Sequence, residues 1–124
     1  MKIYEDWMKR AKSAYLYAIT LTDEDVYYKD KCYQAQQATE KAIKGLLIYY
    51  GIEPEYTHDI GKLLKVLRKH TYIPDNIMKT KHLTQYAIVT RYPGAHYVVT
   101  EEMFAEAIEI AKNCLDWVEK KIIK

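Results

Sequence analysis

The chain has 124 residues, 49% of them hydrophobic, with a formal net charge of +2, so we expect residues 1–124 to form one domain with its own core. No stretch approaches the roughly 18 consecutive apolar residues of a membrane-spanning helix. The N-terminus becomes charged too soon for a signal peptide, which predicts a cytoplasmic location.

Apolar side chains recur at helical spacing almost throughout the chain. From Ile3 onwards they step by four and three residues and predict an amphipathic helix that ends before Thr22. A second helix is expected over residues 30–50, stopped by Gly51 and then Pro54. It carries a stripe of small residues that would let another helix approach closely. The stripe consists of Ala35, Ala38, Ala42 and Gly45.

A third helix is expected to end near residue 70. Thr57 is its candidate cap, and Asp59 lies in the first turn, where the helix dipole favours a negative charge. His58 and Asp59 could instead bind an anion at this helix N-terminus. Capping and packing are the simpler interpretation.

Two more helices complete the predicted set. Pro74 opens a fourth, which runs to about residue 90 because the residue before Pro93 is pushed out of helical geometry. Thr100, followed by two glutamates, starts the last helix. Five helices joined by short loops indicate an all-α, up-and-down bundle with four long helices and one shorter helix.

The second helix also carries polar residues that cannot all face one core. Some of them could hydrogen-bond across a dimer or line a cleft. They are Gln34, Gln36, Gln37 and Glu40.

Positive charge is concentrated in one part of the chain. Residues 62–96 carry seven lysines or arginines and one acidic residue, whereas residues 1–61 and 97–124 each have a net charge of −2. Such a surface suits a polyanion, and Lys79 and Lys81 are candidate nucleotide or RNA contacts within it. The alternative is a solvated helical face that balances acidic neighbours.

Neither a metal site nor a cofactor is predicted. Cys32 and Cys114 stand apart, without a CxxC motif or a Cys/His cluster, so we expect two reduced thiols in the core or an interface. The sequence also has no glycine-rich phosphate loop, GxSxG elbow or HExxH pair.

The main chemical candidate is a pair of residues, Arg91 and His96, that flank a proline. Arginine offers phosphoryl oxygens a permanently charged fork, and histidine exchanges a proton near neutral pH. RNA cleavage without a metal requires both groups. Tyr92 and Tyr97 lie beside the pair, where they could stack on RNA bases.

Three segments together carry a family resemblance. They are CYQAQQATEKAIKGLL at residues 32–47, THDI at residues 57–60 and TRYP at residues 90–93. In this order they resemble the HEPN domain (higher eukaryotes and prokaryotes nucleotide-binding), and the resemblance covers nearly the whole chain. It implies an α-helical bundle that usually forms a homodimer.

The resemblance also implies a function and a partner. Many prokaryotic members sit beside a minimal nucleotidyltransferase, and many are RNases that use an RxxxxH-type motif at the dimer cleft, which falls on Arg91 and His96 here. In the toxin branch, a tyrosine that the partner can modify follows the histidine after one intervening residue. In this chain Tyr97 follows His96 directly, and Val98 occupies the expected place.

Three functional interpretations therefore stay open. The first is a metal-independent endoribonuclease, including a toxin held in check by a nucleotidyltransferase. The second is a non-catalytic subunit that presents nucleotide or substrate to such a partner, and the third is a homodimeric interaction module. In the first, His96 would accept the 2'-hydroxyl proton or donate a proton to the departing 5'-oxygen, while Arg91 would stabilise charge on the phosphorane oxygens.

Overall fold

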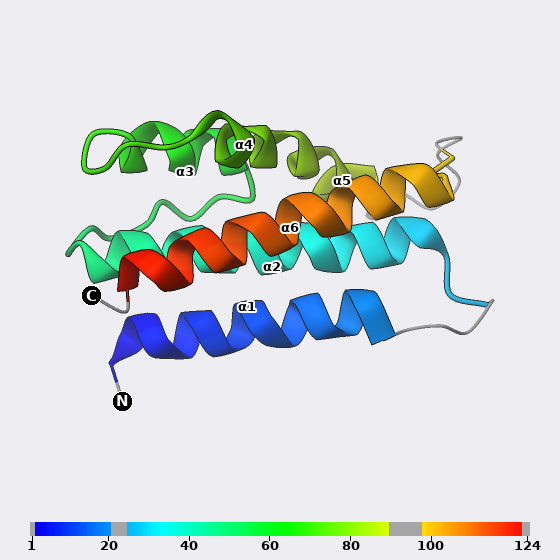
Figure 1. The fold of residues 1–124 in the computed structure, drawn as a ribbon, viewed down its shortest axis with the longest axis horizontal. Coiled ribbons are helices and arrows are strands. Elements are labelled where there is room, and N and C mark those ends of the chain that lie inside the picture. Colours follow the sequence, from blue (N-terminus) through cyan, green and yellow to red (C-terminus); the bar gives the residue numbers. More distant parts are fainter. Residues whose placement is uncertain (1, 21–24, 90–97, 123–124) are drawn as a thin grey trace.

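The computed structural model describes residues 2–20, 25–89 and 98–122. Its elements, in chain order, are α1 (Ile3–Thr20), α2 (Tyr28–Tyr49), α3 (Ile60–Leu67), α4 (Asp75–Met78), the 3-10 helix η1 (Lys79–Leu83), α5 (Thr84–Val89) and α6 (Glu101–Ile122) (Figure 1). No strand occurs in the three described ranges. The predicted all-α fold class is confirmed.

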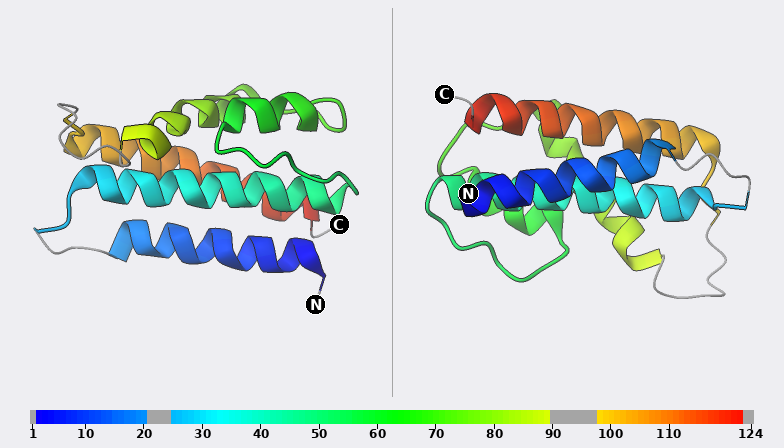
Figure 2. Two further views of the ribbon diagram at one scale, coloured as in Figure 1. Left: turned by 180° about the vertical axis from the view of Figure 1, so that it is seen from behind. Right: turned by 90° about the horizontal axis from the view of Figure 1, so that it is seen from below.

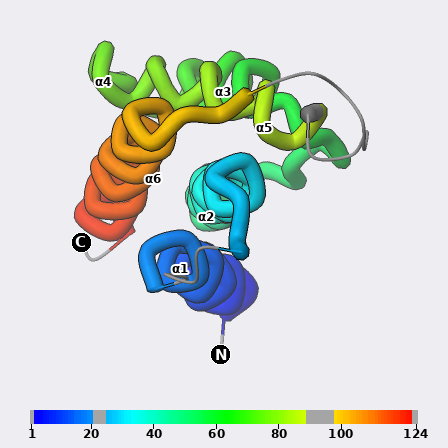
Figure 3. Tube along the Cα trace, turned by 90° about the vertical axis from the view of Figure 1, so that its right-hand side faces the viewer, coloured from blue at the N-terminus to red at the C-terminus, as the bar shows by residue number. Residues whose placement is uncertain are grey.

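The central element of the bundle is α2. Seen end-on, it has α1 on one side, α6 on another and the short helices α3 to α5 on a third (Figure 3). It runs antiparallel to α1 and in the same direction as α6 (Figures 1 and 2). Because neighbours cover it on several sides, thirteen of its residues are buried, against three in α1. Polar residues of α2 therefore become internal.

Small residues bring α1 and α2 together, as the stripe on α2 predicts. The buried residues of α1 are all alanines. On α2, a Cβ added at Gly45 would lie 3.1 Å from Cβ of Trp7 and 3.4 Å from the sulfur of Met8, both on α1. This contact distance leaves no room for a larger side chain unless α1 moves. Gly45 therefore fixes how closely the two helices approach.

The end of α2 follows the predicted glycine signal. Gly51 has a φ of 80°, a left-handed conformation that costs glycine little. The backbone N–H of Ile52 returns to the carbonyl of Leu47 at 2.9 Å, so a tight turn closes the helix. The chain then turns back along the bundle towards α3.

The cap of α3 differs from the prediction. Asp59, not Thr57, is the N-cap, and its Oδ1 accepts a hydrogen bond from the backbone N–H of Lys62 at 3.3 Å. Thr57 stabilises the turn before the helix, because its Oγ1 accepts a hydrogen bond from the backbone N–H of Asp59 at 3.0 Å. The two side chains together form the turn that leads into the helix.

The predicted fourth helix, residues 74–90, is divided into α4, η1 and α5 among its described residues. At the centre of this segment, Thr80 is fully buried, and its hydroxyl donates to the carbonyl of Ile77 at 2.7 Å. A side-chain bond of this kind competes with the regular helical pattern. The described residues thus form three long helices, with a layer of short ones in the fourth position.

The last helix, α6, begins where the sequence predicts. The hydroxyl of Thr100 accepts a hydrogen bond from the N–H of Met103 at 3.2 Å and caps the helix. Cys114 on α6 and Cys32 on α2 are both fully buried free thiols, which confirms the core placement. No helix in the described parts of the chain combines the length and hydropathy needed to cross a membrane.

Candidate functional site: a polar cavity beside α2

The structure describes two of the six predicted site residues. Lys79 and Lys81 are exposed on η1, which packs against α3. Exposed basic residues also lie on α3 and on the turn after it; these are Lys62, Lys65, Arg68 and Lys69. The other four predicted site residues fall outside the described residues: Arg91, Tyr92, His96 and Tyr97.

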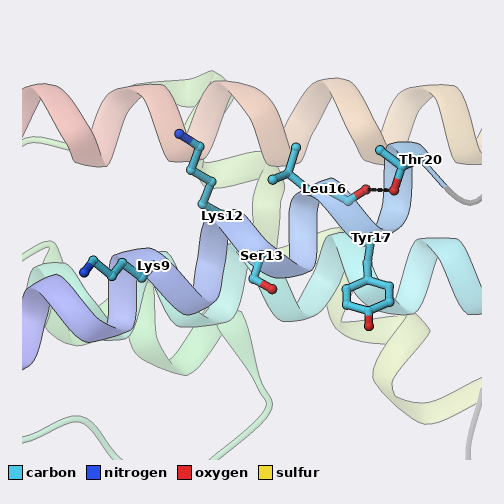
Figure 4. Close-up of a pocket in the computed structure, with 6 residues that line it drawn as sticks. All are labelled: Lys9, Lys12, Ser13, Leu16, Tyr17 and Thr20. Carbon is cyan, nitrogen blue, oxygen red and sulfur yellow. Dashed lines mark hydrogen bonds between the residues drawn. The ribbon is translucent and has the colours of Figure 1, made fainter.

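One hollow, of about 390 Å³, lies along α1. All its lining residues come from this single helix: Lys9, Lys12, Ser13, Leu16, Tyr17 and Thr20 (Figure 4). Lys12 and Leu16 point to one side, and Ser13 and Tyr17 point to the other, so no polar groups converge. The hydroxyl of Thr20 is also occupied, because it donates to the carbonyl of Leu16 at 2.6 Å. This hollow lacks the arrangement of a chemical site.

A second hollow, of about 650 Å³, lies between α1, α2 and the connection from α2 to α3, which runs back beside α2 (Figure 2, left). We term it the Glu40 cavity. Its lining residues are Asp6, Trp7, Arg10, Gln37, Glu40, Lys41, Lys44, Tyr56, Thr57 and His58. It borders the second half of α2. By contrast, α5 ends and α6 begins near the start of α2, where the rings of Tyr28 and Phe104 lie 5.6 Å apart (Figure 1).

Glu40 is the hub of a buried hydrogen-bond network. Its Oε1 lies 2.9 Å from Nδ1 of His58 and accepts from Nε2 of Gln36 at 3.0 Å, while its Oε2 accepts from Nζ of Lys44 at 3.0 Å. The same Gln36 amide donates to the backbone carbonyl of His58 at 3.3 Å. Side chains of α2 therefore hold the connection to α3 against the bundle.

The network also fixes the charge of Glu40. Burial raises the pKa of this carboxyl, but the hydrogen bonds from His58, Lys44 and Gln36, with the charge of Lys44, outweigh burial and hold the pKa below its usual value. Glu40 is then a carboxylate at neutral pH, so Nδ1 of His58 is the donor in their bond. The second ring nitrogen, Nε2, is left to serve a ligand.

Lys44 is held by aromatic rings as well as by Glu40. Its Nζ lies 5.8 Å from the ring centroid of Trp7 and 6.0 Å from that of Tyr56. Lys44 is 8% exposed, whereas the Tyr56 ring at the edge of the cavity is fully exposed. The two rings thus flank one ammonium group, and each contact is a cation–π interaction.

Of the three cations that line the cavity, Lys41 has no carboxylate partner in the described parts of the chain. Its Nζ donates to Oε1 of Gln37 at 2.7 Å, and among the described residues no acidic oxygen lies within 4.0 Å of it. Burial lowers the pKa of Lys41; the charge of Glu40 raises it, and the charges of Lys44 and Arg10 lower it further. Lys41 therefore carries a half-buried charge that an anion would stabilise.

The sequence analysis grouped Gln36 and Glu40 as polar residues of one helix that could line a cleft, but it considered His58 apart from them and did not include Lys44. The common signal on α2 is a spacing of four residues, which puts Gln36, Glu40 and Lys44 on one face of α2. His58 could not be added from spacing, because it reaches Glu40 through the path of the connecting loop. Elsewhere, no group of three or more His, Cys, Asp or Glu side chains in the described ranges could hold a metal ion.

The described elements define a class of protein: a small helical bundle whose central helix carries a buried polar network. The HEPN domain model matches residues 4–121, and the chain belongs to the HEPN family. The predicted family is therefore confirmed. The family places the chain among nucleotide-binding and RNase-type folds.

Two solved structures cover nearly the same length. The crystal structure of ST0689, an archaeal HEPN homologue, is 34% identical and covers 98% of this chain and 99% of its own, with a TM-score of 0.77. The crystal structure of TT1696 from Thermus thermophilus is 32% identical with the same coverage and a TM-score of 0.85. Curated protein sequences gave no significant match.

Proposed function

We propose that this chain is a metal-independent endoribonuclease that acts through Arg91 and His96. The observation that carries the proposal is the RxxxxH spacing of these residues in a chain that matches the HEPN domain over residues 4–121. Arginine and histidine supply the fixed positive charge and the titratable group that the reaction needs.

The proposed reaction is a transesterification. His96 accepts the proton of the 2'-hydroxyl, and the 2'-oxygen forms a bond to the adjacent phosphorus as the bond to the 5'-oxygen breaks. The departing 5'-oxygen takes up a proton from a protonated His96 on the second copy of the chain, and Arg91 balances the charge on the phosphoryl oxygens. Products would end in a 2',3'-cyclic phosphate and a 5'-hydroxyl. General acid–base help of this type contributes about 10²–10⁴ in rate.

A homodimer is part of the proposal, because one histidine cannot easily act as base and acid in the same step. A symmetric dimer would bring two Arg91/His96 pairs into one cleft. Exposed apolar residues lie on either side of the segment: Ile88 is 57% exposed and Val98 is 79% exposed. We propose both as contacts of this dimer.

RNA contacts are proposed on two sets of residues. Tyr92 and Tyr97 would stack on bases, and Lys79 and Lys81 would neutralise phosphates. Both lysines are exposed, and η1 packs against α3, which carries further exposed basic residues; this supports the assignment. Cleavage should then weaken as salt concentration rises, because phosphate contacts release counterions.

A second candidate function is a non-catalytic subunit that presents nucleotide or substrate to a minimal nucleotidyltransferase. The placement of Tyr97 directly after His96 favours it, because the toxin branch has one residue between the two. The net charge of only +2 also favours it over an RNA-binding enzyme. In this case the partner would supply the chemistry.

The test is RNA cleavage in the presence of a chelator. End-labelled structured and single-stranded RNA would be incubated with the wild type, Arg91→Ala and His96→Ala. We expect cleavage by the wild type alone. His82→Ala, which alters an exposed histidine of η1, should cleave like the wild type.

Two results would contradict the proposal. Cleavage by His96→Ala at the wild-type rate would remove that residue from the mechanism. No cleavage by wild-type protein that is folded and dimeric would instead support the second candidate.

A further inference from the structure

We propose that the Glu40 cavity binds a nucleoside monophosphate, with its phosphate on Lys41 and Arg10 and its base against Tyr56 and Trp7. The inference does not rest on RNA cleavage, because the cavity is built from α1, α2 and the connection to α3. It gives the chain a ligand site that is separate from Arg91 and His96 in the sequence.

The charges of the cavity favour one phosphate group. Glu40 neutralises Lys44 at 3.0 Å, and Asp6 contacts Nε of Arg10 at 3.0 Å. This leaves Lys41 as a half-buried ammonium without a carboxylate, and it leaves the terminal amino groups of Arg10 without a partner in the described residues. Lys41 and Arg10 both line the cavity, and the charge of Arg10 lowers the pKa of Lys41. A phosphate monoester bound between them would pair with both donors.

The aromatic residues favour a base attached to that phosphate. Tyr56 is fully exposed at the cavity, although burial of an aromatic ring is favourable, and Trp7 is half-buried on the opposite element. Their centroids both lie within 6.0 Å of Nζ of Lys44, so the rings border the same space. An aromatic base that stacks on Tyr56 would cover its exposed face.

The walls of the cavity are preformed. Glu40 is 3% exposed and accepts three hydrogen bonds, which fix His58 and the connection that carries Tyr56. The volume of about 650 Å³ suits a ligand of mononucleotide size, since small-molecule sites span roughly 300–1,000 Å³. Nε2 of His58 remains to hydrogen-bond the ribose or the phosphate.

Calorimetric titration with AMP, UMP and inorganic phosphate at low salt tests the proposal. We expect the wild type to bind at least one of the two nucleotides about tenfold more tightly than phosphate. Lys41→Ala should weaken nucleotide binding by about ten- to a hundredfold, because it removes a charged donor. Tyr56→Ala should weaken nucleotide binding and leave phosphate binding unchanged. Lys12→Ala, an exposed lysine of α1 outside the cavity, is the matched control and should bind normally.

A second readout locates the ligand. In a Trp117→Phe background, Trp7 is the remaining tryptophan, and nucleotide binding should change its fluorescence. His96→Ala should retain nucleotide affinity, so this result separates the cavity from the proposed RNase site. The proposal would be overturned by folded wild-type protein that binds neither nucleotide, by equal affinity for phosphate and nucleotide, by unchanged binding in Lys41→Ala, or by loss of binding in His96→Ala.

Discussion

Nδ1 of His58 lies 2.9 Å from Oε1 of Glu40, and this bond joins two residues that are 18 positions apart in the chain. It connects the central helix α2 to the loop that leads into α3. Because Lys44 occupies the other carboxylate oxygen, one buried side chain organises both a wall of the cavity and its charge. The stability of the fold and the chemistry of the cavity are thus coupled at Glu40.

Replacing Glu40 with glutamine should destabilise the protein by about 3 kcal/mol, since removal of one partner of a buried ion pair leaves the other charge uncompensated. Urea unfolding of the wild type and Glu40→Gln measures the effect. The double variant Glu40→Gln/Lys44→Met should recover part of the loss, because it also removes the buried ammonium. Equal stability of Glu40→Gln and the wild type would contradict the role given to this network.

The pKa of Glu40 predicts how the stability of the fold depends on pH. The pKa of Glu40 in the folded protein lies below its ordinary value of 4.5. Its ionisation therefore stabilises the fold above that ordinary value, and the contribution is lost as the pH falls through the lower, folded pKa. Thermal unfolding between pH 7 and pH 3 should show a shallower acid loss for Glu40→Gln than for the wild type. If the stability of the wild type and of Glu40→Gln fell in parallel with pH, the loss of stability in acid would come from groups other than Glu40.

Both cysteines should react slowly with thiol reagents in the native state. Burial raises the pKa of the Cys32 thiol to about 11, against a partly opposing hydrogen bond from Tyr86, and burial raises that of Cys114 to about 12. Little thiolate then exists at pH 8, and access is blocked as well. A chromogenic disulfide reagent should report two thiols rapidly in urea and almost none without it. Rapid labelling of either native thiol would contradict the described core.

A charged residue at position 88 should separate the proposed dimer. Ile88→Glu places a carboxylate on exposed apolar surface beside the segment that contains Arg91 and His96. Sedimentation equilibrium should show a shift from dimer to monomer, together with loss of RNA cleavage. Tyr72→Glu, at another exposed aromatic residue, is the control and should remain dimeric. A dimer that survives Ile88→Glu would place the contact elsewhere.

The long helices could be predicted from the sequence because their buried stripes repeat over many turns. The stripe of small residues on α2 also predicted the close approach of another helix at Gly45. A Cβ added at Gly45 would lie 3.1 Å from Cβ of Trp7. The division of residues 75–89 could not be predicted. The apolar spacing of this segment alone resembles that of one helix. The division into α4, η1 and α5 depends on the burial of Thr80 against neighbouring elements.

The sequence suggested that polar residues of α2 could line a cleft, and Gln37 and Glu40 do so, but it did not predict the Glu40 network. Gln36, Glu40 and Lys44 share one face of α2 by their spacing, but nothing in that spacing says that the face is internal. His58 joins them only because the chain turns at Gly51 and returns beside α2. Its neighbour Asp59 takes the cap position that the sequence suggested for Thr57. Tertiary contacts decided each of these outcomes.

The most direct test of the proposed RNase function is cleavage, in chelator, of an RNA and of a matched strand with one 2'-deoxynucleotide at the cleavage position. Transesterification requires the 2'-hydroxyl as nucleophile. We therefore predict that the wild type cuts the RNA to a 2',3'-cyclic phosphate end and leaves the modified strand intact at that position. Cleavage of the modified strand there, or RNA products that end in a 3'-hydroxyl, would contradict the proposed mechanism.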